Sequence, residues 1–268
     1  MIGIALAGIG VCATGMADWQ EARAILRGAE TQPSGQFPQV APSWLPAIER
    51  RRANATSRLA VAAAMQAVRD VPLVEVTRMP TVFSSADGDG EVLTTMLVAL
   101  AQPKVALSPT LFHNSVFNAP PGYWGLAAQS NASSTAVSAG DASFAAGLRE
   151  VQAQIIATQA PVLYIACDVT RSIVFRDAAN APAPFACALR LLPADARQPV
   201  GAQRLDGWSI DMDEEGANAA GRDALPAPFA GNPSAMALRL LSAVAHEKIA
   251  VVRLPYLDNS SLTIHYFP

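Results

Sequence analysis

Cysteine, histidine and charge are scarce in this chain of 268 residues, and each shortage excludes a class of protein. The only three cysteines, Cys12, Cys167 and Cys187, lie scattered in apolar strand-like runs, which excludes a disulfide framework and predicts small buried side chains. Only 15% of residues are charged and the formal net charge is -3, so nothing in the composition favours nucleic-acid binding. No cluster of histidine and cysteine predicts a metal site.

Long hydrophobic runs and nucleotide-binding motifs are missing as well. The apolar opening segment, residues 1–11, is too short and too rich in glycine to span a bilayer, and it lacks the basic start of a secretory signal. We therefore expect a buried first strand, no membrane span and a cytoplasmic protein. No Walker loop, GxGxxG fingerprint or GxSxG elbow is present, and no cofactor is expected.

Strand-like and helix-like segments alternate along the chain, which predicts an α/β fold with a mostly parallel or mixed sheet and helices on its faces. With 51% hydrophobic residues, the chain can bury the core of one domain. The expected strands are residues 2–11, 72–76, 81–83, 134–140, 162–167, 185–192, 249–253 and 260–267. The expected helices are residues 17–28, 54–70, 90–102, 141–158 and 234–246.

Two neighbouring stretches carry the most specific pattern. Residues 108–124 form a turn-rich run that contains Phe-His-Asn-Ser-Val-Phe-Asn-Ala-Pro-Pro-Gly-Tyr-Trp from Phe112 to Trp124. Residues 135–148 then read as a strand and a helix of small residues. Because the first run is rich in turn formers, we expect an exposed loop from Thr110 to Asn118.

The order of these segments resembles the N-terminal half of the thiolase-like fold of β-ketoacyl synthases. The resemblance rests on a glycine-bearing first strand, a basic run before an alanine-rich helix, a small-residue strand end with a glycine-rich turn, a Ser-Pro-aromatic stretch, and an Ala-x-Val strand. These are residues 2–11, 46–70, 83–90, 108–118 and 160–166. One departure is Cys167-Asp168, where the family has a Gly-Gly turn.

More narrowly, the run from Phe112 to Trp124 is similar to that of the β-ketoacyl synthase-like N-terminal proteins found with aryl polyene and related pigment pathways. These are truncated relatives that resemble chain-length factors. The resemblance implies a single domain over residues 1–268, with a thiolase-like half at 1–192 and a closing helix and strands at 236–268. Residues 193–235, which are rich in Ala, Asp, Gly and Pro, are expected to be a loop-rich segment.

A ketosynthase needs a cysteine at a helix N-terminus, where the helix dipole lowers the thiol pKa. The resemblance places that position on Asp141, which we expect to cap the helix. A shift of one turn would place it on Val137 or Ser138 instead. None of these residues is a cysteine, so the catalytic set is expected to be absent.

The resemblance also requires two histidines from a C-terminal half, for which the residues after Leu192 are too few. His246 and His265 lack the glycine-rich neighbours of the family's histidine loops. His113 either bonds the loop backbone or faces a partner. In the latter case the resemblance places the stretch that holds Leu111, Phe112, His113, Phe117 and Asn118 near the end of a partner's acyl tunnel, where bulky apolar groups limit chain length.

The strand from Ser134 to Ala139 matches the one through which the family's dimers pair. The resemblance therefore implies that Ser134, Thr135, Ala136, Val137 and Ser138 form a dimer strand. The implied function is a non-catalytic, chain-length-factor-like subunit of a complete β-ketoacyl synthase, with an acyl carrier protein as an indirect partner. The alternative is a stand-alone acyl-transfer or hydrolytic enzyme that uses Ser138 or Asp141 with His113.

Two further stretches are open to a functional reading. The acidic stretch from Ser84 to Gly90 invites a calcium site, but the later glutamate that an EF-hand needs is missing, so a turn is favoured. The basic run Arg50-Arg51-Arg52 is typical of a solvated face and could also dock an acidic carrier protein.

Overall fold

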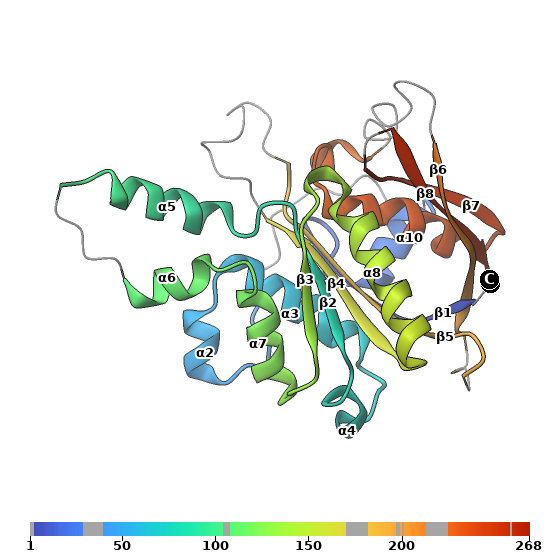
Figure 1. The fold of residues 1–268 in the computed structure, drawn as a ribbon, viewed down its shortest axis with the longest axis horizontal. Coiled ribbons are helices and arrows are strands. Elements are labelled where there is room, and N and C mark those ends of the chain that lie inside the picture. The colour runs from blue at the N-terminus through green and yellow to red at the C-terminus, as the bar shows by residue number, and fades with distance from the viewer. Residues whose placement is uncertain are drawn as a thin grey trace.

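A mixed sheet of eight strands organises the chain, in the order β3-β2-β4-β5-β1-β6-β8-β7 (Figure 1). The computed structural model describes residues 3–28, 40–103, 108–169, 182–196, 199, 201–212, 225–257 and 259–268. The strands are β1 (Ile4–Ala13), β2 (Thr81–Ser84), β3 (Ser134–Val137), β4 (Val162–Asp168), β5 (Phe185–Pro193), β6 (Gln203–Met212), β7 (Ala250–Pro255) and β8 (Ser260–Phe267). Only β2 with β3 and β2 with β4 pair in parallel among these strands, so the mixed form of the sheet is confirmed and the mostly parallel form is not.

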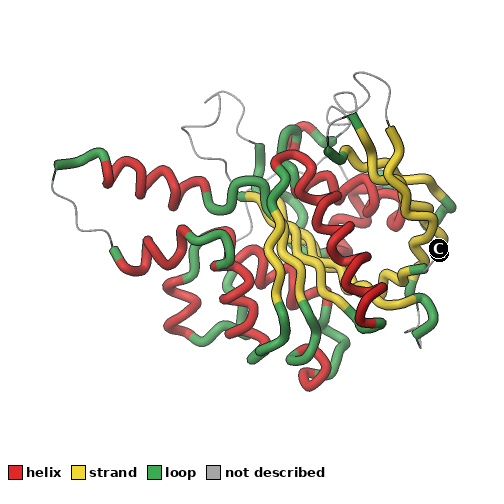
Figure 2. The backbone as a smooth tube through the Cα atoms, in the orientation of Figure 1, coloured by secondary structure: helices red, strands yellow, loops and turns green. Residues whose placement is uncertain are grey.

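Helices cover both faces of the sheet (Figure 2). On one face, α3 (Ala55–Ala67) and α7 (Ala119–Ala128) enclose an apolar cluster with Phe83 and Trp124. On the other face, α1 (Trp19–Leu26), α8 (Ser143–Thr158) and α10 (Ala237–His246) enclose a second cluster. β4 is buried at all seven positions and supplies alternate residues to the two clusters, as expected of a central strand. The remaining α-helices are α2 (Ala47–Arg52), α4 (Leu73–Val76), α5 (Gly90–Leu100) and α6 (Pro109–Ser115).

Glycines in β1 let α3 approach the sheet closely. A β-carbon on Gly10 would overlap the carbonyl oxygen of Ala63, and one on Gly8 would overlap that of Ala67. Gln66 fastens the same helix to β1, because its Oε1 accepts from the Val11 N–H at 3.0 Å. The glycines noted in the first strand therefore serve helix–strand packing.

We expect Gly10→Ala to lower the free energy of unfolding by about 1–3 kcal/mol, since a backbone carbonyl in a packed helix cannot move aside cheaply. Urea denaturation followed by circular dichroism measures the change. Gly231→Ala is not a suitable control, because Gly231 has a φ of +81°, which a residue with a β-carbon adopts only under strain. Gly122→Ala is the matched control, because a β-carbon there has no neighbour within 4 Å and the change should be nearly neutral. Equal stability of the Gly10→Ala chain and the parent would contradict the packing argument.

Three expectations from the sequence are wrong. Residues 72–76 were expected to form a strand, but Pro72 precedes the short helix α4, whose Leu73 and Val74 are exposed. The expected loop at residues 110–118 instead includes α6, followed by α7 from Ala119. Ser108 caps α6 and Pro109 opens it, and the prolines of α7 stand in its first turn, where a missing N–H costs nothing. The loop-rich segment contains the strand β6, while residues 213–224 of that segment lie outside the described residues.

The other expected helices and strands are present with shifted ends. The proline-bearing stretch with Pro33, Pro38, Pro42 and Pro46 reads as a loop in the sequence, and its residues 29–39 lie outside the described residues. In the described part of the chain, no helix has the length and apolar character needed to cross a membrane.

Candidate functional site

The turn between β3 and α8 occupies the place expected for a ketosynthase nucleophile. Gly140–Ala142 forms a 3₁₀ turn, and α8 follows at Ser143. The Ser143 hydroxyl organises the turn: it donates to Gly140 O at 2.6 Å and accepts from the Ala139 N–H at 3.0 Å. The N-cap residue of α8 is Ala142, so Asp141 lies one residue before the N-cap, inside the 3₁₀ turn.

No cysteine stands at this turn. Cys12, Cys167 and Cys187 are buried within β1, β4 and β5. Burial raises the pKa of Cys12 to about 12 and raises the pKa values of Cys167 and Cys187 as well. A thiol with a raised pKa is protonated at neutral pH and is a poor nucleophile. The α8 N-terminus therefore has no thiol to form an acyl thioester.

The alternative catalytic set of Ser138, Asp141 and His113 is not assembled. The Ser138 hydroxyl donates to Ala86 O at 2.8 Å, so its proton is directed at a backbone carbonyl. His113 lies on α6, and its ring packs edge-on against Tyr123 with the centroids 5.7 Å apart. Within the described residues, no hydrogen bond joins His113 to either candidate nucleophile, so the base required for Ser138 is missing.

Asp168 is a buried carboxyl at the C-terminal ends of strands β2, β3 and β4, where it is the centre of a hydrogen-bond network. Its Oδ1 accepts from Ser85 Oγ at 2.7 Å and from the Ala86 N–H at 2.8 Å. Its Oδ2 accepts from Ser234 Oγ at 2.6 Å and from the Ser234 N–H at 3.1 Å. Burial raises the pKa of this carboxyl, and the hydrogen bonds from Ser234, Ser85 and Ala86 oppose the rise.

This network explains the departure at Cys167-Asp168 from the Gly-Gly turn of the family. Asp168 joins the end of β4 to the turn after β2 and to the segment before α10, so it acts as a structural link. This role was not predicted from the sequence. A charged residue that directly follows six apolar residues, 162–167, was the signal available.

The acidic turn after β2 is a helix cap. Asp89 Oδ1 accepts from the Val92 N–H at 3.0 Å and Oδ2 accepts from Thr56 Oγ1 at 3.0 Å, which starts α5 and ties it to α3. Gly88 has a φ of +71°, which the turn requires. Over the described residues, no group of three or more His, Cys, Asp or Glu side chains is arranged to hold a metal ion.

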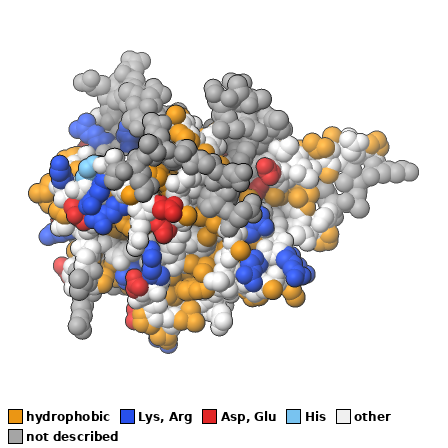
Figure 3. Space-filling model, turned by 180° about the vertical axis from the view of Figure 1, so that it is seen from behind, with side chains coloured by type: hydrophobic (Ala, Val, Ile, Leu, Met, Phe, Trp, Pro, Cys, Tyr) orange, Lys and Arg blue, Asp and Glu red, His pale blue; other side chains and the backbone are white. Residues whose placement is uncertain are grey.

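α5 and α6 project from the body of the molecule as a pair, which we call the arm (Figure 1). α5 is largely apolar in sequence, yet only Gly90 and Val92 of its residues are buried. Apolar side chains lie along the outside of the arm, seen from behind in Figure 3, and include Leu97, Val98, Leu100, Phe112 and Val116. An apolar helix exposed to this extent is typical of an interaction surface.

The arm residues singled out from the sequence differ in their surroundings. Phe112 is 58% exposed and Leu111 is half-buried on α6. Phe117 is directed inward, where its ring meets Phe83 edge-on with the centroids 6.0 Å apart. Asn118 is exposed at the start of α7. Of these residues, Leu111 and Phe112 on α6 present apolar surface outward, and Phe117 does so less.

β3 is the first strand of the sheet and pairs with β2 alone among the described strands. Ser134 and Ala136 are exposed, whereas Thr135 and Val137 are half-buried. Gln154 of α8 donates to Thr135 Oγ1 at 3.0 Å and holds the strand against the helix layer. A groove of about 810 Å³ runs between β3 and α7 and is lined by Trp124 and Leu126 among others. The strand edge and the groove form one continuous open surface.

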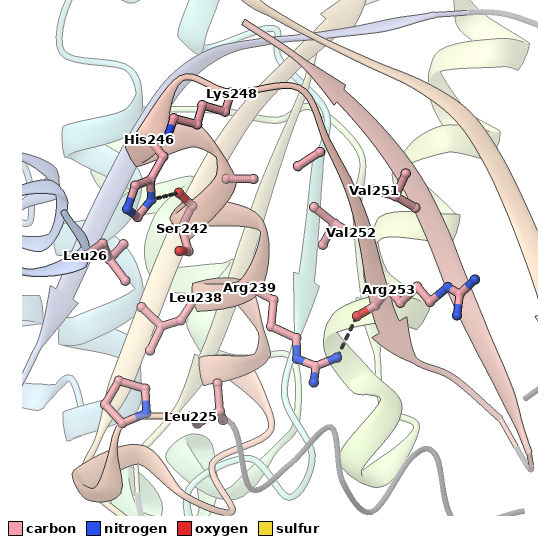
Figure 4. A pocket seen from close by; sticks show the side chains of 13 residues that line it. Leu26, Leu225, Leu238, Arg239, Ser242, His246, Lys248, Val251, Val252 and Arg253 are labelled. Atoms are coloured by element: carbon pink, nitrogen blue, oxygen red, sulfur yellow. Dashed lines mark hydrogen bonds between the residues drawn. The ribbon is translucent and has the colours of Figure 1, made fainter. Parts of the chain in front are cut away.

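A further cavity of about 690 Å³ lies between α10 and β7 (Figure 4). His246 and Arg239 point toward it from α10. His246 Nδ1 lies 2.8 Å from Ser242 O, and Arg239 Nη1 donates to Arg253 O at 2.8 Å. Both side chains are thus hydrogen-bonded to backbone carbonyl oxygens.

Comparison with known proteins agrees with this architecture. Residues 17–241 match the N-terminal domain of β-ketoacyl synthases. A search of curated proteins finds no match. Similar solved structures include a ketosynthase in complex with its chain length factor from Xenorhabdus doucetiae, with 23% identity and a TM-score of 0.73, over 99% of this chain and 100% of that chain. The ishigamide ketosynthase/chain length factor has 12% identity and a TM-score of 0.74, over 98% of both chains.

A β-ketoacyl synthase from Burkholderia phymatum STM815 is also similar, with 16% identity and a TM-score of 0.61, over 91% of this chain and 71% of that chain. The fold is thiolase-like, and the β3–α8 turn holds no cysteine. The chain belongs to the β-ketoacyl synthase family, through the N-terminal domain that it matches over most of its length.

Proposed function

We propose that this chain is a chain-length-factor-like subunit without ketosynthase activity of its own, which pairs with a complete β-ketoacyl synthase and shapes its acyl tunnel. The observation that carries the proposal is that the turn Gly140–Ala142, where the family resemblance puts the ketosynthase nucleophile, has no thiol. Condensation requires an acyl thioester on cysteine, so the chemistry has to reside in a partner.

The exposed surfaces support such a partner. The open edge of β3 can extend a shared sheet, and the groove beside it and the apolar arm would be covered in a pair. The similar solved structures include two described as a ketosynthase with its chain length factor, which this chain matches over nearly its whole length. The pair would bury the arm in an interface in place of leaving it in water.

Co-expression with a tagged β-ketoacyl synthase of the same organism tests the pairing. Size-exclusion chromatography with light scattering should give a species containing one copy of each chain. A clean monomer of this chain beside an active ketosynthase homodimer would contradict the proposal. Both subunits should be cytoplasmic, which fractionation of the producing cells measures.

Phe112 is proposed to limit the tunnel of the partner. We expect Phe112→Ala to lengthen the products of the complex by about one or two two-carbon units, since removal of a ring that the partner would cover opens a cavity. Mass spectrometry of the released acyl chains measures the shift. Ile249→Ala, which removes a side chain 72% exposed next to β7, is the control and should leave the products unchanged. An unchanged product length with Phe112→Ala would show that Phe112 does not limit the tunnel.

The basic run on α2 is proposed to contact an acidic carrier protein. Arg51 and Arg52 are exposed, and Arg52 pairs with Glu49 at 3.3 Å. We expect Arg51→Glu to weaken use of the carrier about tenfold in kcat/KM at low salt and less at high salt, because the attraction is screened. Arg78→Glu on another surface is the control. Kinetics with the carrier varied measure the effect, and a loss that does not depend on salt would contradict the charge argument.

A further inference from the structure

A β-bulge in β1 lies next to an arginine on β5. Leu6 is opposite Leu191 and Gly8 is opposite Arg190, so Ala7 is an extra residue without a partner in the ladder. Its carbonyl oxygen is turned to the Arg190 side chain, whose Nη2 donates to it at 2.9 Å. Bulges of this kind are frequent beside binding and catalytic sites.

The Nε–H of the Arg190 guanidinium is not satisfied. Its Nε is buried and has no hydrogen-bond partner among the described residues. A buried donor without an acceptor destabilises the folded chain. Burial also lowers the pKa of Arg190, while Glu75 and Asp70 oppose that shift. A group held at such a cost is explained if an acceptor binds there.

A cavity of about 530 Å³ opens at this arginine, and we call it the Arg190 cavity. Its charged lining residues are Arg23, Arg69, Arg190, Asp70 and Glu247. Glu247 is already paired with Arg23 and Arg27, so its charge is matched. The lining therefore holds three arginines and two carboxylates, an excess of one positive charge. Glu75 lies outside the lining but close enough to act on Arg190. Its other polar lining side chains, Gln20, Gln66 and Gln203, can donate hydrogen bonds.

We propose that the Arg190 cavity binds a small molecule through an oxyanion, either a phosphate or a carboxylate, that accepts the Arg190 Nε–H. The cavity volume is within the range of small-molecule sites, and a guanidinium edge is suited to two parallel bonds with an oxyanion. The lining includes no residue of β3 or of the arm. The binding is therefore independent of pairing with a ketosynthase.

Nuclear magnetic resonance of the arginine Nε–Hε groups in the full ¹⁵N-labelled chain tests the proposal directly. Inorganic phosphate and acetate are titrated separately, with sodium chloride at equal ionic strength as the reference. We expect a saturable shift of the Arg190 Nε–Hε signal with phosphate or acetate, with a Kd of about 1 mM or tighter. The anion that binds more tightly identifies the phosphate or the carboxylate class.

Arg190→Lys keeps the charge but removes the Nε donor, and should weaken the binding at least about tenfold as measured by calorimetry. Arg204→Lys is the matched control on β6, where the Nε is already engaged by Asp206. Equal shifts with chloride, no shift with any anion, or unchanged affinity in Arg190→Lys would overturn the proposal. The signals of the parent chain decide the matter even if the variant fails to fold.

Discussion

The Ala136→Pro chain is expected to fold but to lose its ketosynthase partner. The parallel ladder uses alternate residues of β3: Thr81 N–H donates to Ser133 O at 3.0 Å, and Ser85 N–H donates to Val137 O at 3.3 Å. By this alternation the backbone groups of Ser134 and Ala136 face the open edge. Proline at residue 136 removes an edge N–H and leaves the bonds to β2 in place.

We expect the affinity for the ketosynthase to fall at least about 100-fold, because one lost backbone bond and the proline ring both oppose close approach of a partner strand. Light scattering and calorimetry on the purified chains measure the loss. Ala136→Ser keeps the N–H and should retain the complex. If the proline variant pairs as tightly as the parent, β3 is not the pairing strand.

Removal of the Asp168 carboxylate is expected to have the largest effect on stability. Asp168→Ala leaves the hydroxyl and N–H of Ser234, the hydroxyl of Ser85 and the N–H of Ala86 without their acceptor. Each buried donor left without an acceptor costs about 1–3 kcal/mol, and some of the four donors will find water or another acceptor. We therefore expect a loss of about 3–5 kcal/mol in the free energy of unfolding. Denaturant unfolding measures it.

The exposed Asp195 provides the matched control, since Asp195→Ala should stay within about 0.5 kcal/mol of the parent. A similarly small effect of Asp168→Ala would mean that the four donors find other acceptors. Asp168 would then not be needed to join the end of β4 to the turn after β2 and to the segment before α10.

The raised pKa of Asp168 also sets the sign of a pH effect. Above the ordinary carboxyl pKa and up to the raised folded value, the folded chain binds more protons than the unfolded chain. The carboxyl therefore contributes most stability below the unfolded pKa, and that contribution is lost as pH rises through the folded pKa. The stability difference between the parent and Asp168→Asn should shrink with rising pH across this window. A difference that grows would contradict the raised pKa.

The sequence predicted the layers of this fold better than its exposed parts. The small and apolar residues of α3, β4 and β5 indicate by composition alone that these elements are buried, so their positions were predicted closely. The run from Ser108 to Trp124 contains turn formers, yet Ser108 and Pro109 start a helix there, and only the position of proline within the helix distinguishes the two outcomes.

The candidate site shows the same division. The absence of cysteine from the turn before α8 could be read directly, and the structure adds that the three thiols are all buried elsewhere. The Asp168 network could not be predicted, because Ser85 and Ser234 are far apart in the chain and only tertiary folding brings them to one carboxylate. The outward placement of Phe112 and the inward placement of Phe117 likewise depend on the two helices that the sequence did not reveal.

Intact-protein mass spectrometry of the reconstituted pair, after incubation with an acyl thioester, shows which subunit carries the acyl group. We expect a covalent acyl group on the ketosynthase subunit and an unchanged mass for this chain. An acyl adduct on this chain, or condensation of malonyl and acyl thioesters by this chain unaided, would contradict the proposed function.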